Sequence, residues 1–264
     1  MRILVCVKQV PDPQKVRMEE TTKRIDRRGD SMISPFDLYA LEGVKTLRDA
    51  GVQVHATAVT MGPAQAVTAL HDSYASGADD CLLLSDEAFA GADLRKTALV
   101  LQKAIEKMEE KDGPFDAIFC GAKSIDGGNS MLPAYLAQLL GRSHAAYALG
   151  CRMTGDGEAL EILKENDLGN QVYRVPFPCV VSFTKNSQEP TYPLIERIIT
   201  ASSMDVPVLN AGDIFGDQQI PQAQTAVDSF EYRDMRRGSL IVNDKDQEEG
   251  ARKLAKMLYD AHVL

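Results

Sequence analysis

The stretch Arg2-Ile-Leu-Val-Cys-Val7 is a short, continuous run of mainly apolar, branched residues that ends at Lys8. Such a run is typical of a strand that is buried on both faces, as in a parallel sheet. Three similar runs follow, at residues 52–60, 81–84 and 115–120. Each of the four runs is followed by a segment whose apolar residues have the spacing of a helix, at residues 36–50, 63–76, 94–109 and 130–140. Four strand–helix units in succession predict a parallel sheet with helices on both faces.

Two other parts of the chain depart from this alternation. Residues 8–35 contain three prolines and a basic stretch, which predicts a long loop or hairpin with Lys23, Arg24, Arg27 and Arg28 at a solvated tip. After residue 140, four strand-like runs are expected to add antiparallel strands to one edge of the sheet, at residues 145–153, 158–164, 171–175 and 179–184.

The last sixty residues are different in composition. Residues 205–224 are rich in Pro, Asp and Gln, which predicts an irregular and extended stretch. One amphipathic helix follows, with Ala251, Leu254, Leu258 and Ala261 on a single face. We therefore expect an α/β domain at residues 1–204 and a C-terminal arm at residues 205–264.

The composition excludes several functional classes. The chain has 264 residues, with 29 Lys and Arg against 38 Asp and Glu, so its net charge is −9. Such an acidic chain is a poor match for nucleic acid. The apolar run at residues 3–7 is too short for a signal peptide or a membrane span, so no membrane insertion is expected. Five scattered cysteines without a CxxC motif fit a reducing cytoplasm and argue against disulfides or a zinc site.

The carboxyl ends of parallel strands are where open sheets bind ligands. The residues that follow the four predicted strands are 8–12, 61–63, 90–93 and 121–130. The fourth stretch has three glycines and predicts a helix capped by Asn129 or Ser130, whose free amides at residues 130–132 would bind an anion. Glycines and capping residues are also ordinary at turns. Four such loops on one edge nevertheless predict a nucleotide or flavin site.

Known catalytic and phosphate-binding motifs do not occur. The sequence has no GxxxxGK[ST], no GxGxxG after the first strand and no GxSxG. Residues 126–130 faintly resemble the SGGxDS loop of ATP pyrophosphatases, but they follow the fourth strand and not the first. His144 is interpreted as an ordinary residue, and the cysteines in strands are interpreted as small buried apolar residues: Cys6, Cys81, Cys120 and Cys179. No catalytic residue is predicted.

Several motifs, in order along the chain, resemble the beta subunit of electron transfer flavoproteins. They are Arg2 to Asp12, Ser34 to Glu42, Met61 to Gln65, Gly77 to Asp79, Ala90 to Asp93, Gly121 to Gly127 and Gln188 to Pro193. The segment 164–182 also resembles the signature region of that family. The resemblance covers about residues 1–200 and implies a doubly wound, mainly parallel sheet of the Rossmann-like, adenine nucleotide alpha hydrolase-like kind.

The resemblance also implies a function. In that family the beta subunit forms a heterodimer with an FAD-bearing alpha subunit, which the C-terminal arm would contact. The beta subunit holds AMP in simple carriers and a second FAD in relatives that perform electron bifurcation with NADH as electron donor. This chain resembles the longer form from anaerobes, which favours FAD over AMP. The implied redox partner is an acyl-CoA dehydrogenase or a similar flavoenzyme.

The motifs carry the family's nucleotide pocket onto particular residues of this chain. The candidate cofactor-binding residues are Cys6, Val7, Lys8, Ser34, Pro35, Phe36, Asp37, Met61, Gly62, Gly91, Ala92, Asp93, Gly121, Ala122, Lys123, Ser124, Ile125, Asp126, Gly127, Gly128, Asn129, Ser130, Met131 and Leu132. The backbone at Cys6 and Met61 would reach the adenine, and the 121–130 loop would hold the phosphates. The candidate docking residues are Tyr192, Leu194 and Ile195, for which the alternative is burial as ordinary loop residues.

Two positions depart from the family pattern. After Gly127 the family usually continues with an acidic residue, a Thr and a Gln-rich turn, whereas this chain has Gly128-Asn-Ser-Met-Leu-Pro133. Backbone amides are therefore expected to make the phosphate contacts. Thr191 stands where the family usually has Arg, which indicates a different docking partner. The competing hypotheses are an AMP-binding structural subunit, an adenylating enzyme of the ATP-pyrophosphatase kind and a nucleotide-sensing module without redox function.

Overall fold

The computed structural model describes residues 1–12, 17–18, 25–26, 31–166, 169–185, 189–226, 241–243 and 246–263. The chain divides into two units, Met1–Asp228 and Ser229–Leu264. The basic residues of the expected solvated tip, Lys23, Arg24, Arg27 and Arg28, lie outside the described residues.

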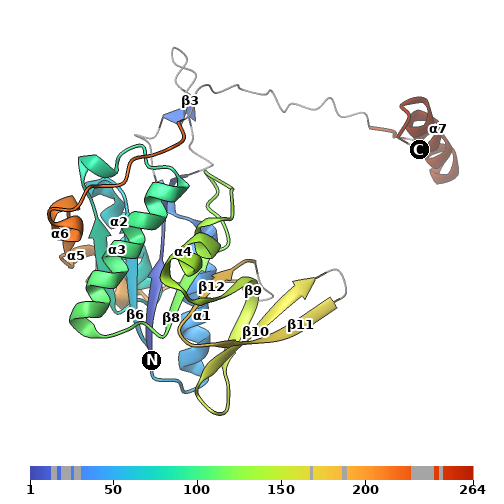
Figure 1. Ribbon diagram of the computed structural model, residues 1–264. Coiled ribbons are helices and arrows are strands. Elements are labelled where there is room, and N and C mark those ends of the chain that lie inside the picture. Colours follow the sequence, from blue (N-terminus) through green and yellow to red (C-terminus); the bar gives the residue numbers. More distant parts are fainter. Residues whose placement is uncertain are drawn as a thin grey trace. The chain divides into compact units, whose positions relative to one another are not determined.

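The first unit is built on a nine-stranded sheet of order β11-β10-β9-β12-β8-β1-β6-β7-β13 (Figure 1). Its parallel part comprises β12 (Cys179–Phe183), β8 (Ala117–Gly121), β1 (Arg2–Cys6), β6 (His55–Met61), β7 (Asp80–Leu84) and β13 (Val208–Leu209). An antiparallel meander completes one edge, with β9 (Ser143–Met153), β10 (Ala159–Asn166) and β11 (Gly169–Pro176). The predicted α/β class, with a mainly parallel sheet and antiparallel edge strands, is confirmed.

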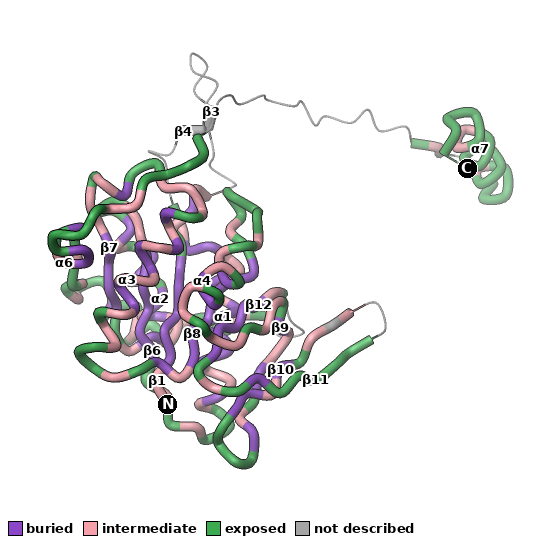
Figure 2. Tube along the Cα trace, in the orientation of Figure 1, coloured by how far each residue is buried: buried purple, intermediate pink, exposed green. Residues whose placement is uncertain are grey.

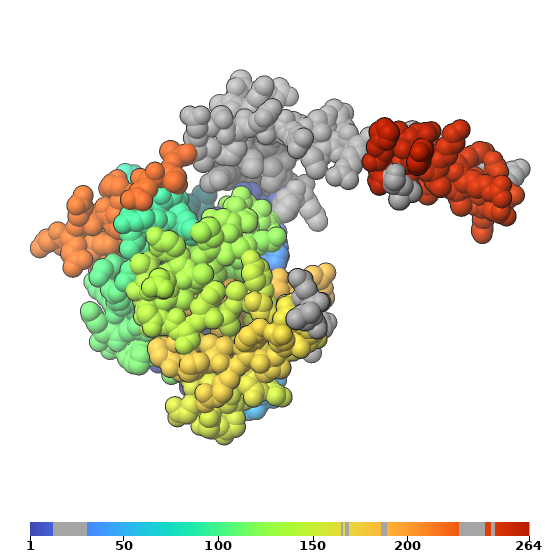
Figure 3. Space-filling view, turned by 45° about the vertical axis from the view of Figure 1, so that its right-hand side comes forward, coloured from blue at the N-terminus to red at the C-terminus, as the bar shows by residue number. Residues whose placement is uncertain are grey.

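One of the expected antiparallel edge strands lies elsewhere. The run at residues 179–184 forms β12, which pairs in parallel with both β8 and β9 and so lies inside the sheet. All five residues of β12 are buried, whereas β11 is exposed at every position except Val175. An apolar strand gains most from an interior position, and the polar strand is left at the edge. Figure 3 shows the meander, in yellow, on the surface beside the α4 region.

Helices cover both faces of the sheet, and each face has its own apolar core. One core packs β1 residues Ile3 and Val5 against α1 (Pro35–Asp49) and α2 (Val67–Ala75). The other packs Leu4 and Cys6 against α3 (Leu94–Asp112) and α4 (Leu132–Leu140). Successive side chains of a strand point to opposite faces, so one apolar strand serves both cores. Figure 2 shows the central strands buried along most of their length.

Shorter elements complete the first unit. Two small ladders join β2 (Gln9–Pro11) to β5 (Ser31–Ile33) and β3 (Arg17–Met18) to β4 (Ile25–Asp26). Short 3-10 helices span Ala64–Ala66 and Glu87–Phe89, and α5 spans Ile195–Ser203. Within the stretch expected to be irregular, the structure has β13 and a short helix, α6 (Ala211–Phe215), whose Ile214 and Phe215 join the α3 core.

The second unit contains the expected amphipathic helix as α7 (Gln247–Asp260). None of its described residues is buried, and Leu254 on the apolar face is 49% exposed. Among all the described helices, none combines the length and the apolar composition that a bilayer crossing requires.

Candidate functional site

The direction in which strands are added to the sheet reverses between β1 and β8, and we call the space outside the carboxyl ends of these two strands the crevice. From β1 the chain adds β6 and then β7 on one side, and it returns to place β8 on the other side. The loops after these two neighbouring strands run in opposite directions, so they separate at the carboxyl ends of the strands. Doubly wound sheets bind ligands at this position. The loops after β1 and β8 are two of those that the sequence marked as candidate binding loops.

Lys8 links these two loops. Its ammonium group lies 2.8 Å from both carboxylate oxygens of Asp126 in the loop after β8. Its backbone carbonyl accepts a hydrogen bond from the N–H of Ser34 (2.8 Å), at the start of α1. Burial acts to raise the pKa of Asp126, but the hydrogen bond and charge of Lys8 outweigh it and lower the pKa. The crevice therefore carries a cation and a carboxylate at its rim.

Asp37 closes the floor of the same crevice. Its carboxylate accepts the N–H of Lys8 (2.7 Å) and the N–H of Gly121 (3.2 Å), so one side chain of α1 joins the ends of β1 and β8. The side chain is buried, and burial raises its pKa to about 7 despite the two backbone hydrogen bonds. A buried carboxyl group with a strongly displaced pKa in a crevice is a common feature of functional sites.

Three more predicted residues surround Asp37. The hydroxyl of Ser34 is fully buried and has no hydrogen-bond partner among the described residues. An orphaned buried hydroxyl costs free energy unless a ligand or water satisfies it. Pro35 opens α1, and the ring of Phe36 lies under the ammonium group of Lys123, 5.3 Å away. This side of the crevice thus has one buried polar atom without a hydrogen-bond partner among the described residues.

The loop after β8 has a different helix start from the expected one. Neither Asn129 nor Ser130 caps α4, which begins at Leu132 without a side-chain cap from the described residues. Ser130 instead takes a left-handed backbone conformation, with φ 55°. Asn129 accepts only a long hydrogen bond, 3.4 Å, from the N–H of Met131. Without a capping side chain, the first-turn amides are left to water or an anion.

The rest of this loop is folded on itself and lies mostly at the surface. The N–H of Gly127 donates to the Ser124 hydroxyl (3.3 Å), and the N–H of Gly128 donates to the Ser124 carbonyl (2.9 Å). Ile125 and Met131 are exposed apolar side chains, whereas Ala122 is buried at the end of β8. The loop thus presents backbone groups and two apolar side chains to its surroundings.

The cysteines of the strands are buried, as interpreted from the sequence. All five are free thiols. Cys6 and Cys120 are in-register neighbours on β1 and β8. Hydrogen bonding to Cys6 and burial raise the pKa of Cys120 well above its ordinary value, so this thiol is neutral. The Cys120 thiol therefore adds no charge to the crevice.

The loops after β6 and β7 contribute differently. Gly62 follows Met61 at the end of β6, and its N–H donates to the Leu84 carbonyl (3.0 Å), which joins these two loops. A Cβ on Gly62 would lie 2.9 Å from the Cβ of Ala66, so close packing requires the glycine. Gly91, with φ 65°, needs the conformational freedom of glycine. The backbone contacts thus join the β6 and β7 loops to each other.

Asp93 caps α3, as its place at a helix start predicts, and it also has a second role that has no local sequence signal. One carboxylate oxygen caps α3 by accepting the N–H of Lys96 (2.8 Å). The other accepts the N–H groups of Gln224 (2.7 Å) and Thr225 (3.1 Å). The hydrogen bond from Lys96, followed by that from Gln224, lowers its pKa to about 2. No local sequence signal connects residues 131 positions apart, so this clamp was visible only in the structure.

Replacing Asp93 with asparagine is therefore expected to loosen residues 224–225. The amide side chain has one acceptor oxygen, which cannot both cap α3 and hold two backbone N–H groups. Hydrogen exchange of the Gln224 and Thr225 amides should become faster in Asp93→Asn. Loss of nucleotide with unchanged exchange would instead place Asp93 in the binding site.

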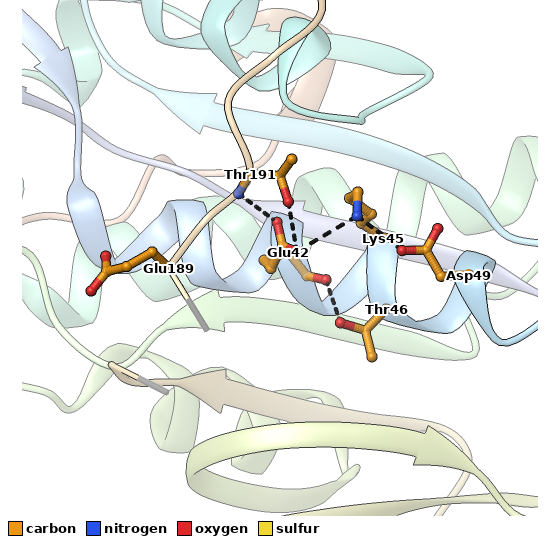
Figure 4. Close-up of a pocket in the computed structure, with 6 residues that line it drawn as sticks. All are labelled: Glu42, Lys45, Thr46, Asp49, Glu189 and Thr191. Atoms are coloured by element: carbon orange, nitrogen blue, oxygen red, sulfur yellow. Dashed lines mark hydrogen bonds and ion pairs between the residues drawn. The ribbon is translucent and has the colours of Figure 1, made fainter. Parts of the chain in front are cut away.

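The candidate docking residues lie at the surface. Tyr192 is 94% exposed, Leu194 is 69% exposed and Ile195 is 74% exposed. The alternative that Leu194 and Ile195 are buried loop residues is therefore wrong for this chain. A separate cavity of about 540 Å³ lies nearby on α1, lined by Glu42, Lys45, Thr46, Asp49, Glu189 and Thr191 (Figure 4). It shares no residue with the crevice.

Residues 22–214 match the family model described as the electron transfer flavoprotein domain. The chain belongs to the electron transfer flavoprotein family. It is 34% identical to the electron transfer flavoprotein subunit beta of Megasphaera elsdenii over 257 residues, which cover 95% of this chain and 94% of that protein. It is 32% identical to the corresponding subunit of Clostridium acetobutylicum, over the full length of both chains.

A third relative comes from Acetobacterium woodii and is named caffeyl-CoA reductase-Etf complex subunit CarD. It is 33% identical over 215 residues, which cover 81% of this chain and 80% of that protein. The resemblance to electron transfer flavoprotein beta subunits is thereby confirmed, and with it a role in electron transfer.

Proposed function

We propose that this chain is the nucleotide-holding beta subunit of an electron-transferring heterodimer and that its nucleotide is FAD. The observation that carries the proposal is the crevice between β1 and β8, where Asp37 and Lys8 tie together the two strand ends. The proposed partner chain is an FAD-bearing alpha subunit, contacted by the C-terminal arm, residues 205–264. The proposed compartment is the cytoplasm.

The crevice has groups that fit a nucleotide. The Ser34 hydroxyl is buried without a partner among the described residues, and a ribose or phosphate oxygen would satisfy it. The uncapped start of α4 at Leu132 favours the negative charge of phosphates. Gly121 lets α1 approach the end of β8 closely. A bound flavin would supply the uptake and release of electrons.

FAD is preferred over AMP because the chain resembles the longer form of the beta subunit, from anaerobes, and that resemblance favours FAD. The Clostridium acetobutylicum relative aligns over the full length of both chains, C-terminal arm included. NADH is proposed as an electron donor and an acyl-CoA dehydrogenase, or a similar flavoenzyme, as a redox partner. The Acetobacterium woodii relative, whose name places it in a caffeyl-CoA reductase complex, supports a partner enzyme that acts on a CoA compound.

Two competing functions are less well supported. An adenylating enzyme of the ATP-pyrophosphatase kind needs a phosphate loop after the first strand. The loop after β1 has no glycine, and its Lys8 is paired with Asp126. An AMP-binding structural subunit would use the same crevice and differs from the proposal only in the bound nucleotide.

The flavin content of the purified heterodimer tests the proposal. The chain is co-expressed with an alpha subunit, the complex is denatured, and the released nucleotides are identified by mass and measured by absorbance. Two FAD per heterodimer are expected. One FAD with one AMP would make the chain a structural nucleotide holder, and one FAD alone would contradict the assignment of the crevice.

A further inference from the structure

Several large apolar side chains that are close together in the sequence are exposed just before α5 and in its first turn. We call residues 192–198 the docking segment. Tyr192 and Leu194 precede α5, and Ile195 and Ile198 lie three residues apart on its exposed side. Exposed apolar side chains that are clustered rather than scattered mark interaction surfaces. Hydrogen bonds with α1 and α2 hold this segment near both of its ends, and we call each of these two sets of contacts a fastener.

The first fastener lies just before the docking segment. Glu42 of α1 is buried, and its two carboxylate oxygens accept the backbone N–H of Thr191 (2.9 Å) and the Thr191 hydroxyl (3.0 Å). One helical turn earlier, the Tyr39 hydroxyl donates to Glu189 (3.2 Å). Figure 4 shows the side chain of Glu42 reaching from α1 to Thr191. Residues 189 and 191 are thus bound to the same face of α1.

The second fastener is Arg197, near the end of the docking segment. Its guanidinium group donates twice to the carbonyl of Tyr74 (3.0 and 2.5 Å) and once to that of Ala78 (2.6 Å). It also lies 4.5 Å above the Tyr74 ring. Tyr74 is in the last turn of α2, at the helix end where a cation is favourable. The fork of Arg197 therefore attaches α5 to the end of α2.

We propose that Glu42 and Arg197 are positioning residues, which hold the docking segment in its binding arrangement before the partner flavoenzyme arrives. This inference rests on the proposed flavoenzyme partner and on the docking role that the family resemblance implies for Tyr192, Leu194 and Ile195. Neither side chain contacts the partner in the proposal. Glu42 acts through the backbone of Thr191, and Arg197 acts through the first turns of α5.

The physical benefit is a smaller entropy loss on binding. Ordering a loop at an interface costs conformational entropy, and a loop that is already fixed avoids part of this cost. Both fasteners are made of hydrogen bonds to charged groups, which are stronger than neutral ones. Releasing one end would weaken encounter-complex formation but leave the flavins and their surroundings unchanged.

The test uses the heterodimer with its alpha subunit and an acyl-CoA dehydrogenase reduced by its acyl-CoA substrate. Glu42→Ala and Arg197→Lys should each raise the KM for the dehydrogenase about 5- to 20-fold, with kcat unchanged. Arg197→Lys keeps the charge but loses the fork, so it isolates geometry from electrostatics. Hydrogen exchange of the amides in residues 191–198 should become faster in both variants.

A second pair of variants guards against misfolding of Glu42→Ala. Thr191→Val removes only the hydroxyl donor and should raise the KM for the dehydrogenase. Thr191→Ser keeps both hydrogen bonds and should leave this KM at the parent value. Lys45→Gln is the matched control, because Lys45 lines the same cavity and lies 3.9 Å from Glu42, but it does not hold Thr191. Its KM should stay within about twofold of the parent value.

Leu194→Ala separates this inference from the docking proposal. A raised KM in Leu194→Ala, with unchanged KM in Glu42→Ala and Arg197→Lys, would overturn the positioning role and leave docking in place. An unchanged KM in both Leu194→Ala and Ile195→Ala would overturn docking itself, and the positioning role with it. A fall in kcat in the two fastener variants would also contradict the inference.

Discussion

The Gly121→Ala variant is expected to lose about 3 kcal/mol of unfolding free energy and its bound nucleotide. A Cβ at this position would lie 2.2 Å from Oδ1 of Asp37 and within 3.0 Å of two backbone atoms of residues 36 and 37. Backbone atoms cannot move aside as a flexible side chain can. The methyl group would therefore push the start of α1 away from β8 and open the floor of the crevice.

Urea unfolding and the absorbance of released nucleotide measure this effect. Gly150→Ala is the matched control, since no heavy atom lies within 4 Å of the added Cβ and the backbone is not left-handed. Its unfolding free energy should stay within about 0.5 kcal/mol of the parent value. A Gly121→Ala variant that is as stable as the control and keeps its nucleotide would remove the crevice from the proposed site.

The stability of the parent chain is expected to fall as the pH rises from about 4 to about 7, because of Asp37. Its pKa is 3.8 when unfolded and about 7 when folded. Between these values the unfolded chain has released the proton that the folded chain still holds, so each increase in pH favours unfolding. Since each pKa unit corresponds to about 1.4 kcal/mol, the loss is on the order of 4 kcal/mol. Above about pH 7 this contribution is constant.

Asp37→Asn separates this effect from all other titrations. Asparagine does not ionise. The unfolding free energy of the parent minus that of the variant should therefore fall between pH 4.5 and pH 7 and then stay level. Urea unfolding at half-unit steps from pH 4.5 to pH 8 measures the difference. A constant difference over the whole range would mean that the folded pKa of Asp37 lies near its ordinary value.

Much of the fold was readable because it depends on local pattern. The apolar runs of β1 and β8 and the helical spacing of α1 reflect which face each residue must bury, and that information is contained in a short window of sequence. The same kind of local signal identifies the loops after these strands as candidate ligand-binding loops. Glycine and helix-starting residues at strand ends follow from backbone sterics alone.

The tertiary structure decided what depends on residues far apart in the chain. The position of β12 inside the sheet follows from its parallel pairing with β8 and β9, and the choice of these partner strands is not contained in the residues of β12 itself. The hydrogen bonds from the amides of residues 224–225 to the Asp93 carboxylate are likewise visible only in the structure. The fasteners at Glu42 and Arg197 likewise join segments more than 100 positions apart.

The sequence by itself determined the α/β class, the family, and the strand ends that could hold a nucleotide, because these follow from short apolar runs and motifs. Only the tertiary structure decided which of those ends meet. It placed the β1 and β8 loops on one crevice around Asp37 and Lys8, and it left the Ser34 hydroxyl buried without a partner among the described residues. The physical reason is that strand order and buried hydrogen bonds are set by non-local packing, which no window of sequence contains.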